Sequence, residues 1–411
     1  MARDYLKERR QTVPQQRSVT FPAVSVKEGA RLRRQLVDDL ARRGLVRDRR
    51  VERALLAVPR EIFVPEFAAQ CGLEAVYRDE AIVTKHDVHG VPVSSSSQPA
   101  IMASMLERLD LREGQRVLEI GAGTGYNAAL IAEIVGSEGR VISVELDPEL
   151  AKRSRSVLRQ AGHRVRVVVG DGRAGWAAQA PYDRIIATAS ASELPHTWLE
   201  QTVEGGRIEV PLRLRNSLFA QAIPTLERRG SELRSISVLC GGFMPLRNNA
   251  ADAGARPPML TAREILDTHE SALFELRGDA LSRLPRTARR RLLALALGEP
   301  RTRRLGLRAP TWPLLLYIVL TGPAERLVFG SRVQVGVIDR RGTSLALVGG
   351  MKKTVDRVVA YGARDSEDLL ISLIDEWKAR GRPSEDNLEI RVSFRNEHST
   401  LRHLWKAPPK R

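Results

Sequence analysis

The feature that most constrains the fold is a glycine-rich segment at residues 117–126. An apolar run from Val117 to Ile120 is followed by three glycines at alternate positions, and a helical pattern then extends from Asn127 to Ile134. This order predicts a strand, a tight turn and the N-terminus of a helix, where backbone N–H groups and the helix dipole meet a ligand. The turn is therefore the first candidate for a binding site.

The spacing after this turn indicates which ligand it takes. About 20 residues further on, the run Val141–Glu145 predicts a second strand that ends in an acid, and Glu145 is placed to accept both hydroxyls of an adenosine ribose. The glycines follow a Gly-x-Gly-x-Gly pattern, which lacks the Gly-x-x-Gly step that lets a helix approach a pyrophosphate. A third apolar run is followed by Gly170-Asp171-Gly172. Together these features favour S-adenosylmethionine over a dinucleotide as cofactor.

Strand and helix patterns alternate between residues 115 and 248, which predicts a parallel, doubly wound sheet. Two further strand patterns, at 218–226 and 233–239, predict a terminal antiparallel pair. We expect an α/β fold, with a Rossmann-like methyltransferase domain that has N-terminal helices and precedes a smaller α+β domain. The expected parts are a flexible basic arm at 1–29, a catalytic domain at 30–248, a linker at 249–258 and a C-terminal domain at 259–411.

Local patterns give further expectations. Helical periodicity begins near Ala30, and residues 77–99 are predicted to form a long polar connection. The C-terminal part is expected to contain, in order, helical residues at 270–310, a core strand at 312–320, a hairpin of 333–338 and 344–348, a helix at 366–380 and a final strand at 388–394.

The net charge of +17 is concentrated in two segments. Residues 1–60 hold 16 Lys and Arg against 7 Asp and Glu, and residues 283–308 hold nine arginines against Glu299 alone, so the rest of the chain is close to neutral. A nucleic-acid enzyme is expected to line its active face with such an excess, but here the excess lies away from the predicted cofactor site. Solvated helix faces are the favoured interpretation, ahead of a docking surface for an acidic partner and of nucleic-acid binding.

Several other classes of function are not favoured. No apolar stretch reaches the roughly 18 residues needed to span a bilayer, and the N-terminus is polar, without the apolar core of a secretory signal. We therefore expect a cytoplasmic protein with no membrane partner. No cluster of His, Cys and Asp has the spacing of metal ligands, and His86 and His89 are interpreted as solvated loop residues, so no metal is expected.

Short motifs follow one another in a fixed order. They are Val58-Pro-Arg-Glu-Ile-Phe-Val-Pro65, Tyr77-Arg-Asp79, Ser97-Gln-Pro99, Gly170-Asp-Gly172, Ala180-Pro-Tyr-Asp183, Gly205-Gly-Arg207 and Phe243-Met-Pro-Leu246. With the glycine turn, they resemble the protein-L-isoaspartate O-methyltransferase family over about residues 30–248. The lead into Ser97 is longer than the family's usual Gly-Gln-Thr-Ile-Ser, and the residues beyond 250 have no counterpart in the housekeeping repair enzyme. Such an extended form looks like an actinobacterial branch, some members of which are associated with ribosomally made peptides.

The resemblance implies roles for individual residues. Ser97 matches the family's active-site serine, which is expected to hydrogen-bond the substrate carboxylate, although a serine before a helix can also be an N-cap. Glu119 is expected near the methionine amino group of the cofactor, or facing solvent at the strand end. Three glycines, Gly121, Gly123 and Gly125, are expected beside the methionine moiety of the cofactor, and Glu145 is expected at the ribose. Asp171 and Gly172 are expected at the adenine, with a turn aspartate as the alternative interpretation of Asp171.

The implied function is a carboxyl O-methyltransferase. It would transfer the methyl group of S-adenosylmethionine to L-isoaspartyl, or aspartyl, residues of proteins or peptides, and the ester would collapse to a succinimide, which leads to protein repair. One alternative is a tailoring O-methyltransferase for a ribosomally made peptide, and another is an inactive cofactor-binding module that docks an acidic partner. Thr188-Ala-Ser190 stands where base-methylating enzymes usually need Asn/Asp-Pro-Pro-aromatic, which argues against a nucleic-acid substrate.

Overall fold

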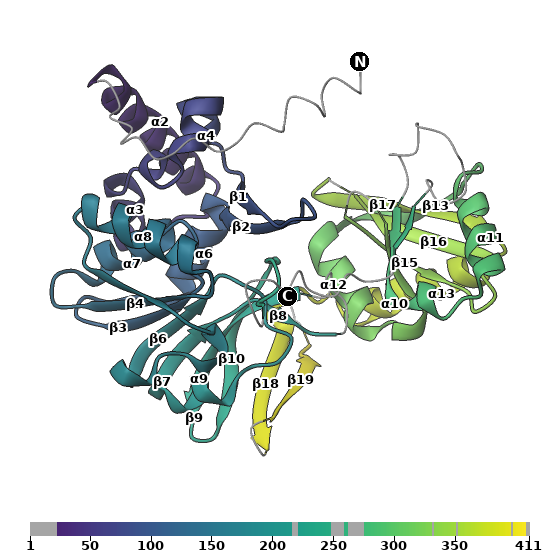
Figure 1. Ribbon diagram of the computed structural model, residues 1–411. Coiled ribbons are helices and arrows are strands. Elements are labelled where there is room, and N and C mark those ends of the chain that lie inside the picture. Colours follow the sequence, from purple (N-terminus) through teal and green to yellow (C-terminus); the bar gives the residue numbers. More distant parts are fainter. Residues whose placement is uncertain are drawn as a thin grey trace.

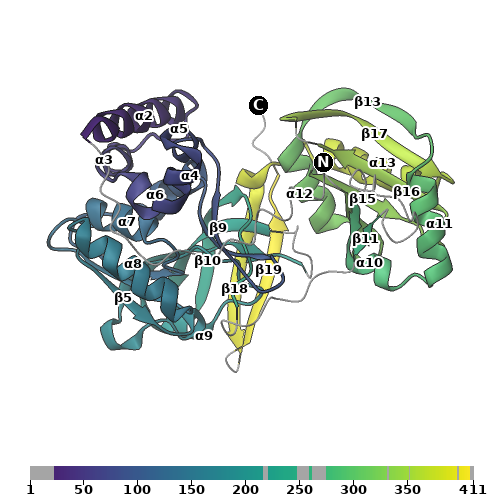
Figure 2. The ribbon, with the colours of Figure 1, turned by 45° about the horizontal axis from the view of Figure 1, so that its top comes forward.

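The computed structural model describes residues 23–215, 221–247, 259–261, 275–330, 333–350, 352–395 and 398–407. These residues form two large β-sheets that lie side by side, with helices packed on their faces, and one small hairpin (Figures 1 and 2). The predicted linker at 249–258 lies outside the described residues, so the division of the chain into domains stays a prediction.

A group of helices precedes the first sheet. Helix α2 begins at Ala23 and ends at Arg42, so the predicted flexible arm is wrong for residues 23–29, while residues 1–22 lie outside the described ones. Leu32, Leu36 and Leu40 are buried because their spacing of four places them on one face of the helix. The following elements are α3 (Arg49–Ala57), η1 (Arg60–Phe63), α4 (Pro65–Cys71) and α5 (Leu73–Val76).

The first sheet has ten strands, in the order β19-β18-β10-β9-β7-β6-β3-β4-β5, with β8 paired to β9. Its parallel half confirms the predicted doubly wound sheet and consists of β3 (Arg116–Ile120), β4 (Arg140–Glu145), β5 (Val165–Val169), β6 (Tyr182–Ala187) and β7 (Thr202–Glu209). The predicted terminal pair is also confirmed, as β9 (Gln221–Arg229) and β10 (Glu232–Cys240) are antiparallel. Strand β8 is Leu212–Arg213.

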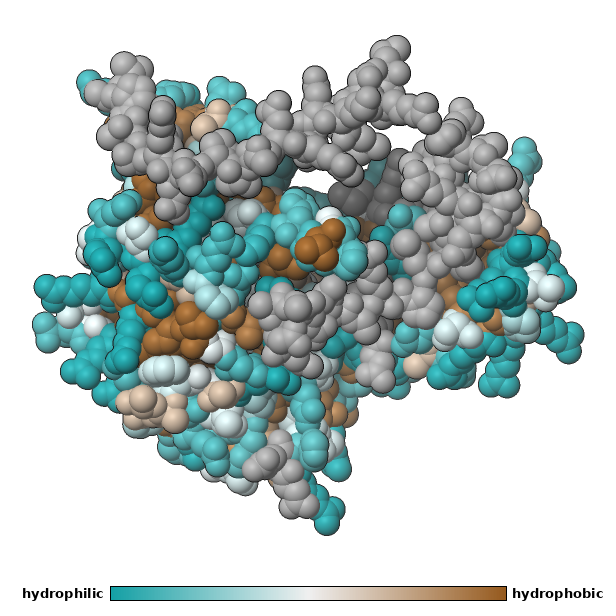
Figure 3. Space-filling view, viewed as in Figure 1, coloured by the Kyte–Doolittle hydropathy of each residue, from teal (hydrophilic) through white to brown (hydrophobic). Residues whose placement is uncertain are grey.

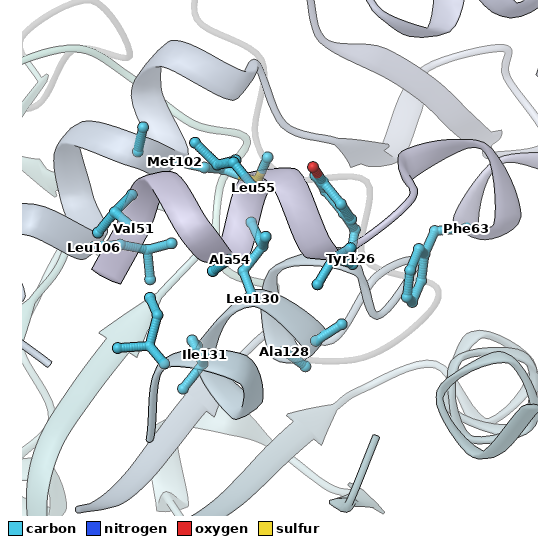
Figure 4. Packing of buried hydrophobic residues seen from close by; sticks show 14 of the residues in the cluster. Val51, Ala54, Leu55, Phe63, Met102, Leu106, Tyr126, Ala128, Leu130 and Ile131 are labelled. Atoms are coloured by element: carbon cyan, nitrogen blue, oxygen red, sulfur yellow. The ribbon is translucent and has the colours of Figure 1, made fainter. Parts of the chain in front are cut away.

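Helices cover both faces of this sheet because its strands are apolar on both sides. Val117 and Val141 face a core shared with α6 (Pro99–Leu109), α7 (Tyr126–Val135) and α8 (Pro148–Gln160). Leu118 and Ile142 face a second core on the other side, where α9 (His196–Glu200) packs. Figure 4 shows part of the first core, in which side chains of α3, α6 and α7 interlock.

The predicted polar loop at 77–99 is wrong, because a hairpin occupies most of it (Figure 1). Strand β1 (Ile82–His86) pairs with β2 (Pro92–Ser96), from Ile82 opposite Ser96 to His86 opposite Pro92. At the turn, Asp87 accepts the N–H groups of His89 at 2.9 Å and Val91 at 2.7 Å. The sequence concealed the strands because polar residues occupy most of their positions, so no apolar alternation marks them.

The second sheet has seven antiparallel strands in the order β11-β12-β14-β15-β16-β17-β13. Its strands are β11 (Met259–Thr261), β12 (Glu275–Arg277), β13 (Arg301–Pro310), β14 (Leu327–Gly330), β15 (Gln334–Ile338), β16 (Ser344–Gly349) and β17 (Thr354–Gly362). The predicted hairpin of β15 and β16 and the predicted helix α13 (Asp365–Ala379) are confirmed. The helical prediction for 270–310 holds for α10 (Asp279–Ser282) and α11 (Arg286–Ala296) but is wrong for β12 and β13.

Residues 312–320, predicted as a core strand, lie instead in helix α12 (Thr311–Thr321). Pro313 is tolerated because the first turn of a helix needs no backbone donor there. The helix lies between the two sheets (Figures 1 and 2): Leu316 and Leu320 pack in the core of the first, and Leu314 and Ile318 in that of the second. A helix buried on opposite faces has a continuous apolar run, so its sequence lacks helical periodicity.

The chain then returns to the first sheet. Strand β18 (Leu388–Arg395) pairs with β10, where Leu233 lies opposite Val392, and β19 (His398–Trp405) forms the edge of the sheet beside β18. The predicted final strand at 388–394 is thus confirmed as a strand. It belongs to the ten-stranded sheet rather than to the seven-stranded one, however.

Within the described ranges, no helix is both long and apolar enough to cross a membrane. On the face drawn in Figure 3, hydrophilic residues cover much of the coloured surface, with smaller apolar areas between them.

Candidate functional site

A pocket opens at the carboxyl ends of β3 and β4, where ligands bind in parallel α/β sheets. Four segments supply much of its wall: residues 93–97 of β2 and its extension, the glycine turn at 120–124, residues 144–146 after β4, and residues 244–247. The hairpin therefore reaches the same cavity as the glycine turn, although about two dozen residues separate them in the sequence.

The three glycines of the turn have positive φ angles, of 96°, 51° and 87°. A Cβ on Gly121 would lie 2.6 Å from the Thr188 hydroxyl, and a Cβ on Gly125 would lie 3.2–3.3 Å from Leu158 and Ser154 of α8. Gly121 and Gly123 line the pocket, whereas Gly125 does not. Packing of α7 against α8 therefore accounts for a glycine at position 125, and its predicted place beside the cofactor stays a prediction.

Glu145 is buried at the end of β4 and lines the pocket. One carboxylate oxygen accepts the N–H of Gly123 at 2.9 Å, and the other accepts the N–H of Asp147 at 3.0 Å. Each oxygen can accept a further hydrogen bond. The carboxylate is therefore fixed in place with acceptor capacity left for a ligand.

The side chain of Glu119 is fully buried, so the alternative that it faces solvent is wrong. It does not line the pocket, and its predicted place near the methionine amino group stays a prediction. It accepts the amide of Asn127 at 2.9 Å and the hydroxyl of Ser143. Burial raises the pKa of Glu119 to about 7, although both hydrogen bonds act in the opposite direction. The residue that does reach the pocket is Asn127, whose Oδ1 is buried without a hydrogen-bond partner among the described residues.

Ser97 lines the pocket just before α6. The N-cap of that helix is Gln98, and no side chain caps it, so the interpretation of Ser97 as a helix cap is wrong. The Ser97 hydroxyl forms no hydrogen bond with the described part of the chain, while its carbonyl accepts a bond from Arg60 at 3.1 Å. The hydroxyl is therefore available to a substrate.

Arg60, at the start of η1, hydrogen-bonds the backbone of this segment. It is fully buried, and burial lowers the pKa of its guanidinium. Its partners are carbonyl and hydroxyl oxygens at 2.9–3.4 Å, namely the carbonyls of Val76, Arg78, Glu80, Ser96 and Ser97 and the hydroxyl of Ser96. The sequence contained Arg60 in a motif of the resemblance but gave no indication of this role.

Gly172 lines the pocket, and a Cβ there would lie 2.4 Å from Ile120. Its carbonyl accepts the indole N–H of Trp198 at 2.8 Å. Asp171 does not line the pocket and caps the 3-10 turn η2 (Gly172–Ala174), where it also pairs with Arg173. Burial raises the pKa of Asp171, but the bonds to Arg173 outweigh it and leave the pKa low. This position agrees with the turn-aspartate alternative.

Lys85 joins the hairpin to the turn after β4. Its ammonium lies 2.7 Å from the carboxylate of Asp147 and 2.8 Å from that of Glu149, and Asp147 is the N-cap of α8. Burial lowers the pKa of Lys85, but its two carboxylate partners raise it further, so the net shift is upward. Since the N–H of Asp147 binds Glu145, this ion pair connects the hairpin to the candidate ribose acceptor.

His86 and His89 are both exposed, but only His89 lies in a loop, because His86 is the last residue of β1. Across the described residues, no group of three or more His, Cys, Asp or Glu side chains could hold a metal ion.

The parallel sheet, the glycine turn and an acid at the end of the second strand define this chain as an α/β methyltransferase of the S-adenosylmethionine-dependent class. More narrowly, it belongs to the family described as protein-L-isoaspartate(D-aspartate) O-methyltransferase, whose model matches residues 31–250.

Similar proteins carry the same description. The protein-L-isoaspartate O-methyltransferase of Methanopyrus kandleri is 43% identical over 187 residues, which are 44% of this chain and 77% of the relative. That of Hyperthermus butylicus is 41% identical over 223 residues, 52% of this chain and 88% of the relative.

A solved structure of a protein-L-isoaspartate O-methyltransferase superposes on this chain with a TM-score of 0.51 and 27% sequence identity. The match covers 90% of this chain and 99% of the chain in that structure. A match of that extent runs past residue 250. The expectation that the residues beyond 250 have no counterpart among repair enzymes therefore needs correction: at least one protein with this name aligns with much of them.

Proposed function

We propose that this chain transfers the methyl group of S-adenosylmethionine to the free carboxylate of L-isoaspartyl residues in proteins. Family membership supports the reaction and the cofactor. The observation that carries the proposal is that one pocket is lined by the glycine turn, by Glu145 and by Ser97. Cofactor and substrate groups would meet there.

The pocket has the polar groups that S-adenosylmethionine requires. Glu145 would accept the ribose hydroxyls, and the buried Oδ1 of Asn127, which has no partner among described residues, would accept the ammonium of the methionine moiety. Gly121 and Gly123 leave room at the turn for the same moiety. Glu119 would act through Asn127, whose amide it orients. When bound, the cofactor supplies an electrophilic methyl group.

The residues on the substrate side have a limited chemical task. A carboxylate is already anionic at pH 7, so it needs no general base before it attacks a methyl group. The chain must hold the carboxylate in line and exclude water. Ser97 would donate a hydrogen bond to one carboxylate oxygen, and Arg60 would keep the Ser97 backbone in position.

The product is a methyl ester, in which methoxide is a better leaving group than the oxygen of a carboxylate. The neighbouring backbone nitrogen can attack the ester carbonyl, release methanol and close a succinimide ring. Hydrolysis of the ring returns some normal aspartyl linkages, so repeated cycles would repair damaged protein. We place this activity in the cytoplasm.

Two peptides that differ only in an aspartyl or isoaspartyl linkage test the proposal, with tritiated S-adenosylmethionine as methyl donor. We expect label on the isoaspartyl peptide alone. Ser97→Ala should lower kcat by about tenfold to a hundredfold, the effect of one lost hydrogen bond of about 1–3 kcal/mol. Its affinity for S-adenosylhomocysteine should stay within about twofold of wild type, because the hydroxyl faces the substrate.

Ser156→Ala is the matched control, because Ser156 is exposed on α8 and does not line the pocket. Equal labelling of both peptides would contradict isoaspartate specificity and support the peptide-tailoring alternative. Labelling of neither, with cofactor binding intact, would support an inactive binding module. A Ser97→Ala variant that turns over like Ser156→Ala would refute the role of the serine.

A further inference from the structure

A second concave site lies on the opposite edge of the parallel sheet. It is a groove of about 780 Å³ beside the amino ends of β4 and β5 and the adjoining part of α8, and it shares no lining residue with the pocket. In Figure 2, α8 and β5 lie at the outer end of the ten-stranded sheet, away from the strands drawn in yellow. The groove is therefore separate from the proposed methyl-transfer site.

The groove is lined by cationic side chains from separate segments. They are Arg140 at the start of β4, Arg155 and Arg159 on α8, Arg164 before β5 and Arg166 within β5, with His163 beside them, and none of the lining residues is acidic. The sequence did not reveal this gathering, because the segments are dispersed in a region whose net charge is close to zero. Only the fold brings them together.

Most of these arginines are not neutralised by the protein. Arg155 donates to the carbonyl of Val167, at 3.0 Å and 3.3 Å, and Arg166 lies over the ring of Trp176. Arg140, Arg159, Arg164 and Arg166 form no ion pair with any residue that the structure describes. A concave surface lined by charges of one sign focuses the electrostatic potential and concentrates counter-ions. A bound anion would relieve this repulsion.

We propose that this groove binds an oligophosphate group, as carried by a nucleoside triphosphate or by inorganic tripolyphosphate. Guanidinium groups pair with phosphate oxygens through two parallel hydrogen bonds. The volume of the groove lies within the range of roughly 300–1,000 Å³ of sites for small molecules. A triphosphate carries several negative charges, with which the arginines that line the groove can pair.

Two other anionic partners fit less well. The exposed acids Glu133 and Glu138 flank the groove, so the cationic surface is too short to follow a nucleic-acid backbone. Along an extended acidic peptide, side chains on one face are about 7 Å apart, so fewer carboxylates than phosphates enter the groove. This inference does not depend on the proposed methyl transfer.

Isothermal titration of the full chain at physiological salt tests the proposal, with tripolyphosphate and ATP as probes. The groove variant is Arg140→Gln/Arg159→Gln/Arg164→Gln, and the matched control is Arg290→Gln/Arg291→Gln/Arg304→Gln. All six arginines are exposed, and both variants lose three charges. We expect wild type and control to bind tripolyphosphate within twofold of each other, and the groove variant at least tenfold more weakly.

Tighter binding of ATP than of tripolyphosphate would identify a nucleotide as the source of the phosphates, and equal binding would identify the phosphate chain alone. The proposal would be overturned if both triple variants weakened binding equally, or if neither probe bound to wild type. It would also be overturned if an octaglutamate peptide or a short single-stranded oligonucleotide bound more tightly than both phosphate probes. Equal melting temperatures of the two variants would establish that the groove variant is folded.

Discussion

Glu209 is an ionisable residue of β7 that is fully buried where β7 pairs with β9. One of its oxygens accepts the hydroxyl of Thr225, while the other is buried without a partner among the described residues. Burial raises the pKa of Glu209 to about 8, against the smaller opposing effect of Thr225. The folded protein therefore holds a proton at neutral pH that the unfolded chain releases.

This proton makes stability depend on pH. Because the folded pKa lies above the ordinary value of 4.5, the stabilising contribution is complete below about pH 4.5 and is lost as pH rises towards 8. Through this group, the free energy of unfolding changes by at most about 1.4 kcal/mol per pH unit. Glu209→Gln keeps a neutral polar side chain and should remove this part of the slope. Its melting temperature should be close to that of wild type at pH 5 and higher at pH 8.5.

Melting curves at several pH values provide the measurement. Glu119, whose pKa is about 7, titrates in both proteins, so the difference between them isolates Glu209. A constant difference in melting temperature from pH 5 to 8.5 would contradict a protonated Glu209.

At the scale of elements, the hairpin of β1 and β2 forms part of the pocket wall. It contacts the turn after β4 and the glycine turn. Lys85 of β1 pairs with Asp147 after β4. Ser95 of β2 lies close to the glycine turn, since a Cβ built on Gly123 would be 3.6 Å from the Ser95 carbonyl oxygen. The hairpin is therefore fastened to the segments that carry Glu145 and Gly123.

Removing the cation should loosen this attachment. Lys85→Met leaves the carboxylate of Asp147 without its ammonium partner, and Asp147 orients Glu145 through its N–H. We expect the Kd for S-adenosylhomocysteine to rise by roughly threefold to tenfold, which corresponds to about 0.7–1.4 kcal/mol for a partly buried ion pair. Calorimetric titration measures this change.

Lys85→Arg keeps the positive charge and should recover most of the affinity. Lys378→Met is the matched control, because Lys378 forms a comparable pair with Asp375 on α13, whose residues do not line the pocket. An equal loss of affinity in Lys378→Met would show that the effect is not specific to the hairpin.

At the scale of the whole molecule, the two sheets share buried elements. Ile390 of β18 is fully buried in the core of the ten-stranded sheet, although more than 140 residues separate it from β10. Within the same part, Ser399 of β19 accepts the N–H of Leu194 at 2.9 Å. A contact towards the second sheet comes from Arg215, which binds the carbonyls of Leu320 and Gly322, each at 2.5 Å, at the end of α12.

Shortening a side chain in β18 should therefore destabilise the methyltransferase part. Ile390→Ala should cost about 2–5 kcal/mol, as is typical of a large-to-small change in a core. Leu404→Ala, at an exposed position of the neighbouring strand, should change stability by less than about 0.5 kcal/mol. S-adenosylhomocysteine should raise the melting temperature of the same transition that Ile390→Ala lowers. Two separate transitions, with only the other one shifted by Ile390→Ala, would contradict this coupling.

Much of the fold and part of the site could be predicted from the sequence. The parallel sheet was predictable because strands such as Val117–Ile120 and Val141–Glu145 have long apolar runs, and glycines with positive φ mark the turn. Helix α12 was not predictable, since burial on opposite faces removes the periodicity that distinguishes a helix from a strand.

Some residues of the candidate site could likewise be predicted from the sequence, and others could not. Among the predicted residues, five line the pocket and three do not: the first set is Ser97, Gly121, Gly123, Glu145 and Gly172, and the second is Glu119, Gly125 and Asp171. Residues that act at long range could not be predicted: Arg60 binds carbonyls up to 37 positions away, and Lys85 pairs with a residue 62 positions away. Such contacts depend on the tertiary fold, which no local pattern encodes.

The return of β18 to the first sheet has a consequence during synthesis on the ribosome. Residues 388–405 emerge only after the entire seven-stranded sheet has been translated, so until then β10 is the exposed edge of a growing nascent chain. An unpaired strand edge invites pairing with other chains. The nascent protein must therefore keep this edge from pairing with other chains while the residues between β10 and β18 are translated, and the hairpin of β18 and β19 covers the edge only when synthesis is nearly complete.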